Sequence, residues 1–257
     1  MLAESFALMP LWVFLVACSV TLAAGFVKGA IGFAQPLVMM SGMSLVMDPL
    51  LAIAGLILPT TLANVMQALR YGPRDAWDAA REYWRYIVIV CVMIMIVTQF
   101  VASIPTQTFY LVLGIPVMGL SVIQLFGFRF SIAAQWRRVA EWGIGTVAGI
   151  LGGITGTWGP PTVLYLMALD VPKAKMIIVQ GVVYGLGSIS LLGGHVASGV
   201  LNATTAPFSA VLMIPAVLGI RVGVAFGNRL DPEVFRRFIL IVLVVAGANL
   251  LRRGIFG

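Results

Sequence analysis

The segment Lys28-Gly29-Ala30-Ile31-Gly32-Phe33-Ala34-Gln35-Pro36 interrupts an apolar run that extends from Leu11 to Met47. As one continuous helix this run would be about 55 Å long, nearly twice the thickness of the hydrocarbon core of a bilayer. Proline removes an amide donor and disfavours helix in the residue before it, while glycine lowers the cost of non-helical backbone angles. We therefore predict a helix, a break at this segment and a second helix.

A second segment, Gly152-Gly153-Ile154-Thr155-Gly156-Thr157-Trp158-Gly159-Pro160-Pro161, interrupts the other long apolar run, Val139 to Leu169, in the same way. At a constant offset the two segments align, with Gly29 on Gly153, Gly32 on Gly156 and Pro36 on Pro160. We interpret the chain as an internal duplication. Repeat 1 covers about 11–128 and repeat 2 about 137–253, within one membrane domain spanning 1–257.

The composition indicates a polytopic helical membrane protein. Of the 257 residues, 61% are hydrophobic and only 10% are charged, and the mean hydropathy is +1.05; a soluble domain is about 25% charged. Six further apolar runs have the length of a single helix: 49–70, 86–104, 109–128, 176–198, 206–227 and 235–251. We expect an all-α fold, with an interfacial helix at 73–85.

Most Lys and Arg residues lie between apolar runs, so the net charge of +7 reports on membrane topology. It does not indicate a nucleic-acid partner. If each long run crosses the membrane once, these cations divide nine against five between the two sides. If each run turns back as a hairpin, they divide twelve against two, with only Arg252 and Arg253 in the minority. The positive-inside rule favours hairpins, which place the two halves in opposite orientations and both termini outside the cytoplasm.

The ionisable residues favour an anionic substrate. All nine acidic residues lie at segment ends or in loops, whereas carriers of cations usually hold a carboxylate within the membrane. Sodium bound by backbone carbonyls stays possible. The deep ionisable residues are Lys28, Arg221 and His195, and each either has a function or reaches an interface with its polar end.

The two breaks are the predicted binding site, because a half-helix whose N-terminus faces the middle of the membrane presents free amides and a positive dipole end. The alternative is that glycine and proline serve only close helix packing. We predict that the following residues bind the substrate: Lys28, Gly29, Gly32, Gln35, Pro36, Asn64, Gly153, Thr155, Gly156, Thr157, Trp158, Gly159, Gln180 and Arg221.

The paired Gly-Pro breaks, from Ala24-Gly25 to Pro36-Leu37 and from Ala148-Gly149 to Pro160-Pro161, resemble those of the sulfite exporter TauE/SafE family over essentially the whole chain. The resemblance implies export or uptake of sulfur-containing anions, such as sulfite, sulfoacetate or other organosulfonates, across a bacterial inner membrane. The first break departs from the usual glycine run, because it contains Lys28 and the larger residues Phe33 and Gln35.

We expect a secondary transporter that exposes its anion alternately to each side, without a cofactor, a metal or an enzymatic activity. Coupling to protons or sodium and assembly as a homodimer are both open. One alternative is a passive channel or a subunit that needs a partner, because the chain has no P-loop of its own. Another is an intramembrane enzyme that uses His195 and Ser198, three residues apart on one helix face.

Overall fold

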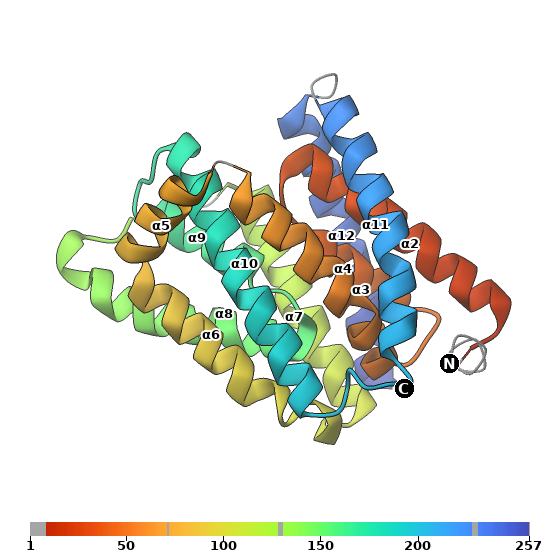
Figure 1. Ribbon diagram of the computed structural model, residues 1–257. Coiled ribbons are helices and arrows are strands. Elements are labelled where there is room, and N and C mark those ends of the chain that lie inside the picture. Colours follow the sequence, from red (N-terminus) through yellow and green to blue (C-terminus); the bar gives the residue numbers. More distant parts are fainter. Residues whose placement is uncertain (1–8, 71, 128–130, 228–230, 257) are drawn as a thin grey trace.

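The computed structural model describes residues 9–70, 72–127, 131–227 and 231–256, and every regular element in these ranges is a helix (Figure 1). The first half contains α2 (Leu11–Ile31), α3 (Gln35–Met43), α4 (Pro49–Leu69), α5 (Pro73–Glu82), α6 (Trp84–Thr98), η1 (Val101–Ser103) and α7 (Thr106–Leu125). The second contains η2 (Ala134–Trp136), α8 (Arg137–Thr155), α9 (Gly159–Ala168), α10 (Lys173–Ala197), α11 (Ala206–Gly227) and α12 (Pro232–Phe256).

Six of these helices are long and apolar enough to cross a membrane, namely α2, α4, α7, α10, α11 and α12. Helix α6 is apolar but has only 15 residues. Helix α8 carries Arg137, Arg138 and Glu141 in its first two turns. The prediction of a polytopic all-α membrane protein is confirmed.

Both long apolar runs are broken at the glycine- and proline-containing segments, as predicted. Helix α2 ends at Ile31, and Gly32 has a left-handed φ of 82°. Helix α8 ends at Thr155, and Gly156 has a φ of 71°. The returning helices α3 and α9 have 9 and 10 residues, or about 14 Å of rise, which is half a hydrocarbon core. Each hairpin therefore has one long and one short arm.

The helices of the two halves pack in matching pairs. Contacts of Gly25 with Ala216 and of Gly29 with Ile220 run in the same direction along α2 and α11, so these helices are parallel. The corresponding pair, α8 and α6, is parallel as well. By contrast, α4 is antiparallel to its counterpart α10, and α7 is antiparallel to its counterpart α12. Inverted repeats would produce these pairings, and the repeat bounds stay a prediction.

Several basic residues lie around α5 and its junction with α6. Lys175 Nζ contacts Glu82 Oε2 at 2.6 Å, and Arg85 Nε contacts Glu141 Oε2 at 2.7 Å. Arg253 lies far from them in sequence and space, with its guanidinium 4.7 Å from the ring centre of Tyr110. Arg129 and Arg229, which also entered the charge count, lie outside the described residues.

The predicted interfacial helix exists as α5 and ends at Glu82, three residues earlier than expected. Trp77 and Trp84 are exposed, as an interfacial position requires. Tyr83 is instead buried at the junction with α6. The aromatic residues of this segment therefore divide between surface and core.

We predict that Gly219→Ala destabilises the protein, because a Cβ there would overlap the backbone carbonyl of Leu22 on α2. Separating two backbones costs about 1 to 3 kcal/mol, which corresponds to a loss of roughly 2 to 12 °C in Tm for a domain of this size. Thermal unfolding of the purified protein in detergent measures the change. The matched control is Gly143→Ala on α8, where a Cβ meets no atom within 4 Å. Equal Tm values for the two variants would contradict the close-packing role.

Candidate functional site

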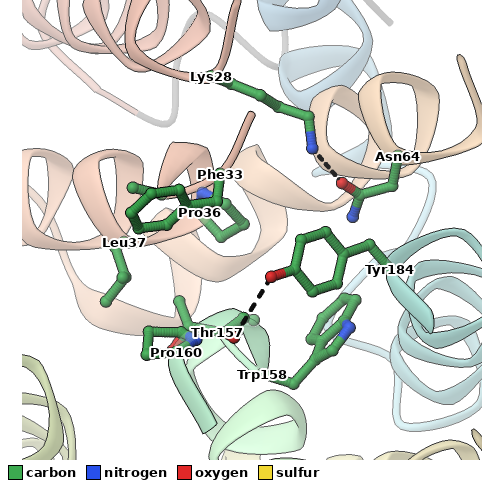
Figure 2. Close-up of a pocket in the computed structure, with 12 residues that line it drawn as sticks. Lys28, Phe33, Pro36, Leu37, Asn64, Thr157, Trp158, Pro160 and Tyr184 are labelled. Atoms are coloured by element: carbon green, nitrogen blue, oxygen red, sulfur yellow. Dashed lines mark hydrogen bonds between the residues drawn. The ribbon is translucent and has the colours of Figure 1, made fainter. Parts of the chain in front are cut away.

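The two breaks meet at one pocket beside the middle of α10 (Figure 2). The cavity itself is small, with a volume of about 20 Å3. Both breaks contribute to its wall, together with one residue each from α2, α4 and α10. Its lining residues are Lys28, Phe33, Ala34, Pro36, Leu37, Asn64, Gly156, Thr157, Trp158, Gly159, Pro160 and Tyr184. The lining contains one cation, no carboxylate, and a majority of apolar or aromatic side chains.

Lys28 lies in the last turn of α2 and is only 6% exposed. Its ammonium donates a hydrogen bond to Asn64 Oδ1 on α4, and it lies 5.9 Å from the ring centre of Tyr184 on α10. Figure 2 shows the lysine reaching from α2 toward these two residues. Both partners are uncharged. The described residues therefore provide no counter-charge for this ammonium.

This arrangement leaves the charge on Lys28 only partly compensated. The penalty for burying an ion is several kcal/mol even after the protein relaxes. A hydrogen bond that involves a charged group returns about 1.5 to 3 kcal/mol, and the C-terminal end of α2 contributes at most about 2 kcal/mol. An anion in the pocket would supply the missing charge.

The short helices α3 and α9 both begin at the pocket, and their positive dipole ends lie at its wall. The first helical hydrogen bond of α3 runs from Val38 N to Ala34 O at 3.0 Å, so the amides of Gln35 and Leu37 precede the helical ladder. In α9, Pro160 and Pro161 have no N–H, so the first turn of this helix presents fewer amides than that of α3. The α3 end is therefore the richer donor.

Trp158 and Tyr184 form the aromatic side of the pocket, with ring centres 6.5 Å apart and planes at 81°. The Tyr184 hydroxyl donates to the carbonyl of Gly159 at 3.3 Å and so ties α10 to the second break. Trp158 Nε1 is buried without a hydrogen-bond partner among the described residues. Gly187 gives the indole its space, since a Cβ there would lie 2.8 Å from Nε1. The indole Nε1 is therefore packed against α10 and is not exposed to the pocket.

The chain matches the model of the sulfite exporter TauE/SafE family over residues 17–250. It belongs to this family. The match includes both breaks and every residue of the pocket, and it makes the protein a multi-pass member of a family of membrane transporters. Comparison with curated proteins and with solved structures found no match.

The pocket of this TauE/SafE protein contains half of the residues predicted to bind the substrate. The structure brings together Lys28, Pro36, Asn64, Gly156, Thr157, Trp158 and Gly159. Seven others lie outside the lining: Gly29, Gly32, Gln35, Gly153, Thr155, Gln180 and Arg221. Their substrate-binding role stays a prediction, and the structure gives several of them a different contact.

Gly29 and Gly153 lie where helices pack closely. A Cβ at Gly29 would lie 2.9 Å from Val224 N on α11, and one at Gly153 would lie 2.7 Å from Val97 Cβ on α6. Gly32 provides the left-handed turn that ends α2. These glycines allow the helix packing and the turn next to the breaks, so they position the pocket without lining it.

The polar residues outside the lining differ in burial. Thr155 Oγ1 lies 2.5 Å from Thr157 Oγ1, one step behind the pocket wall. Gln35 is fully buried, and its amide nitrogen lies 3.9 Å from Met39 Sδ. Gln180 is half-buried and Arg221 is exposed on α11. An apolar run in the sequence does not reveal which helix face a cation occupies, and this explains the position of Arg221.

The sequence analysis did not assign five lining residues to the site. Phe33, Ala34, Leu37 and Pro160 belong to the quoted break regions, and the αL conformation of Ala34 (φ 72°) has no signal in its residue type. Tyr184 was one of many polar groups within apolar helices. Only its position on the α10 face opposite Asn64 distinguishes it.

The proposed His195 and Ser198 pair does not form in this TauE/SafE structure. Ser198 Oγ lies 3.5 Å from the main-chain oxygen of His195, not from its ring. The imidazole is fully buried, and its nitrogens make no hydrogen bond of ordinary geometry with the described residues. His195 therefore does not reach an interface, and the dyad that the enzyme alternative requires is absent.

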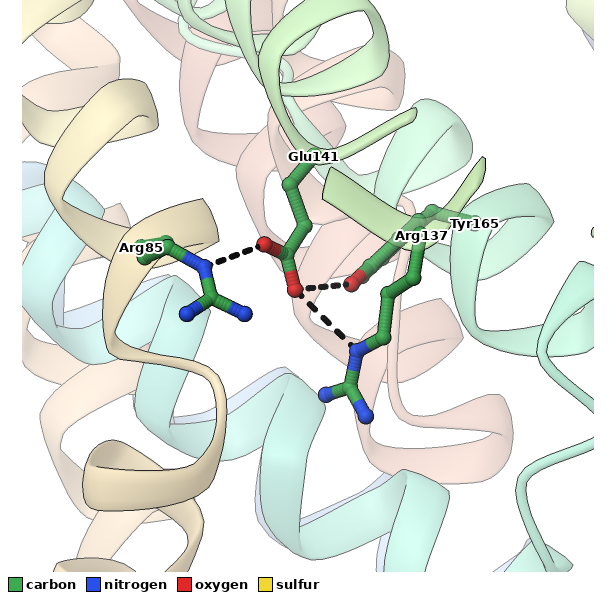
Figure 3. A network of polar contacts seen from close by, with 4 residues as sticks. All are labelled: Arg85, Arg137, Glu141 and Tyr165. Atoms are coloured by element: carbon green, nitrogen blue, oxygen red, sulfur yellow. Dashed lines mark hydrogen bonds and ion pairs between the residues drawn. The ribbon is translucent and has the colours of Figure 1, made fainter. Parts of the chain in front are cut away.

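Glu141 lies near a segment end, as expected of the acidic residues, but among the described residues it is a carboxylate that is buried. Glu141, in the second turn of α8, is 1% exposed (Figure 3). Its Oε2 accepts from Arg85 Nε at 2.7 Å, and its Oε1 accepts from Arg137 Nε at 3.1 Å and from the Tyr165 hydroxyl at 3.2 Å. The group belongs to a structural network with these two arginines and not to the pocket.

This network is connected to the pocket through α9. The rings of Tyr165 and Tyr86 stack with centres 4.4 Å apart. The Tyr86 hydroxyl lies 3.0 Å from Thr162 Oγ1, which donates to the carbonyl of Trp158 at 2.7 Å. Helix α9 is thus fixed between α6 and α8 from its first residues to Tyr165.

We predict that Glu141→Gln lowers Tm clearly more than Glu82→Gln does. Removal of the buried carboxylate weakens two charged hydrogen bonds worth about 1.5 to 3 kcal/mol each, discounted because Arg85 and Arg137 are 36% and 32% exposed. The Glu82–Lys175 pair is 40% and 46% exposed, and such pairs contribute about 0 to 1 kcal/mol. Thermal unfolding of both variants tests this, and equal losses would show that the network is not structural.

Proposed function

We propose that this TauE/SafE protein is a secondary transporter of a small anion, sulfite or an organosulfonate, and that the anion binds in the pocket between the two broken hairpins. The pocket is exposed alternately to each side of a bacterial inner membrane. We further propose that both chain termini lie on the periplasmic side. Basic residues such as Arg85, Arg137 and Lys175 lie around α5 and its junction with α6, and the positive-inside rule places such a cluster in the cytoplasm.

The observation that carries this proposal is the convergence of both breaks on one buried cation. Lys28 and the N-terminal ends of α3 and α9 favour negative charge. The lining includes no carboxylate that would repel it. A cation would meet the opposite conditions, so the chemistry of the pocket selects the sign of the substrate.

The shape of the lining favours an anion with an organic part. Phe33, Leu37, Pro36 and Pro160 present apolar surface opposite Lys28. A sulfonate would place its charged oxygens near the ammonium and the amides, and its carbon chain against these side chains. Sulfite fits the charged half alone.

The antiparallel packing of α4 against α10 and of α7 against α12 supports alternating access. Two inverted halves can adopt two arrangements of similar energy. In the second arrangement each hairpin takes the conformation that the other had in the first. A rocking of one hairpin against the other would open the pocket first to one side and then to the other.

Transport into proteoliposomes that contain only the purified chain tests the function. Vesicles loaded with unlabelled sulfite or methanesulfonate should accumulate the labelled anion by exchange, and protein-free vesicles should not. The same anions should raise the Tm of the detergent-solubilised protein. If no anion exchanges and none raises Tm, the proposed function is wrong. Conductance that does not saturate with anion concentration would favour a passive channel.

We predict that Lys28→Ala weakens anion binding by about 10- to 100-fold, the equivalent of a charged hydrogen bond. Thr157→Ala removes a neutral hydroxyl from the wall and should weaken binding by about fivefold. Titration of the thermal shift with methanesulfonate measures both. Arg138→Ala is the control, because it removes an exposed cation far from the pocket. Unchanged affinity in both pocket variants would exclude this site assignment.

A further inference from the structure

We propose that Lys28 binds a proton together with the substrate anion, so that the protein moves one proton with each anion and needs no sodium ion. This inference rests on the proposed anion transport and specifies its energy source. It assigns the coupling site to the same side chain that recognises the anion.

The argument begins with the surroundings of the Lys28 amine. The side chain is 6% exposed, and its hydrogen-bond acceptor is the neutral amide oxygen of Asn64. The nearby Tyr184 ring attracts a cation weakly. A neutral amine can donate the same hydrogen bond to Asn64, so the contact holds in either protonation state. The empty pocket therefore does not require the charge.

An anion changes this balance. An ammonium and an anion in contact stabilise each other strongly in a site that excludes water. Because the two binding events are linked, the anion increases the affinity for the proton by the same factor by which the proton increases the affinity for the anion. Proton and anion thus enter together and leave together.

Among the residues that the structure describes, the other titratable groups do not interrupt this pairing. On α10, Tyr184 faces Lys28 but donates its hydroxyl to Gly159 O, and His195 lies about 16 Å further along the helix by its rise. Arg221 on α11 and Arg237 on α12 are exposed, and Glu141 on α8 is held by two arginines. Helix α3 has no ionisable residue and α4 has none near Asn64. Lys28 is the basic side chain in the lining of the pocket.

The transport cycle follows from two electrically neutral forms of the site. On one side, the neutral amine takes a proton from water and the ammonium pairs with a monoanion. The loaded pocket opens to the other side, where the anion leaves and the ammonium returns the proton to water. The empty pocket then reorients with a neutral amine. For a monoanion and one proton, no net charge crosses the membrane.

The experiment uses proteoliposomes of the full chain and labelled methanesulfonate, because a sulfonate keeps a single charge across the pH range used. Three gradients are imposed separately: pH, sodium, and membrane potential set by potassium and valinomycin. We expect an alkaline interior to drive accumulation at least tenfold above the no-gradient level, with one proton per anion reported by an internal pH dye. Sodium and potential should have no effect.

The variant Lys28→Arg separates binding from coupling, because arginine keeps its proton in proteins. We expect it to retain exchange of labelled for unlabelled methanesulfonate, in which only the loaded pocket reorients. Accumulation driven by a pH gradient should fall at least tenfold, since the empty site stays charged. His195→Gln should keep both activities, and the exposed Arg138→Lys serves as the matched control.

The outcomes separate the two proposals. Accumulation driven by sodium, or by potential without proton movement, would overturn the coupling inference and leave anion transport standing. Loss of pH-driven accumulation in His195→Gln, with retention in Lys28→Arg, would assign the proton to histidine and overturn it as well. If Lys28→Arg fails to fold, the proton-to-anion ratio of the unaltered protein decides. Absence of any exchange in that protein would instead refute the proposed function.

Discussion

The backbone of each broken helix must find its hydrogen-bond partners inside the protein, because lipid offers none. This constraint determines where the site lies. The turns at 32–34 and 156–158 leave amides and carbonyls outside the helical ladder. Each turn is covered by the opposite hairpin and by the middle of α4 and α10. The Tyr184 hydroxyl bond to Gly159 O ties α10 to the first residue after the second of these turns. The pocket is thus the place where irregular backbone is tolerated, and it is also where the dipole ends meet.

Close glycine packing makes this burial possible. On α2, Gly25 and Gly29 allow the backbone of α11 to approach, and Gly149 and Gly153 do the same between α8 and α6. Each hairpin is thereby fixed along its long arm, while its short arm depends on fewer contacts. In the second half, the Tyr86–Thr162–Trp158 chain and the Glu141 network hold the short arm as well. The two hairpins are therefore supported differently, although their sequences align.

The helical fold and the positions of the two breaks were predictable because length and backbone chemistry act locally. A 37-residue apolar run that contains Gly32 and Pro36 has to break, whatever surrounds it. Which helix face a residue occupies is decided by neighbours distant in sequence. Arg221 therefore lies on the surface despite its apolar context, Glu141 is buried despite its place near a helix start, and Tyr184 lines the pocket. No local sequence signal distinguishes these residues from others of the same type that have the opposite burial.

The single lysine also bears on the charge of the substrate. A monoanion paired with the Lys28 ammonium leaves the pocket neutral, whereas a dianion would leave one negative charge among apolar side chains and the weaker dipoles of α3 and α9. The cost of that uncompensated charge rises as the pocket closes and water is excluded. Sulfite occurs as both a monoanion and a dianion near neutral pH, so the singly protonated form suits the site. A sulfonate would keep its single charge over the pH range in which sulfite changes from monoanion to dianion, and its carbon chain would meet Phe33 and Leu37.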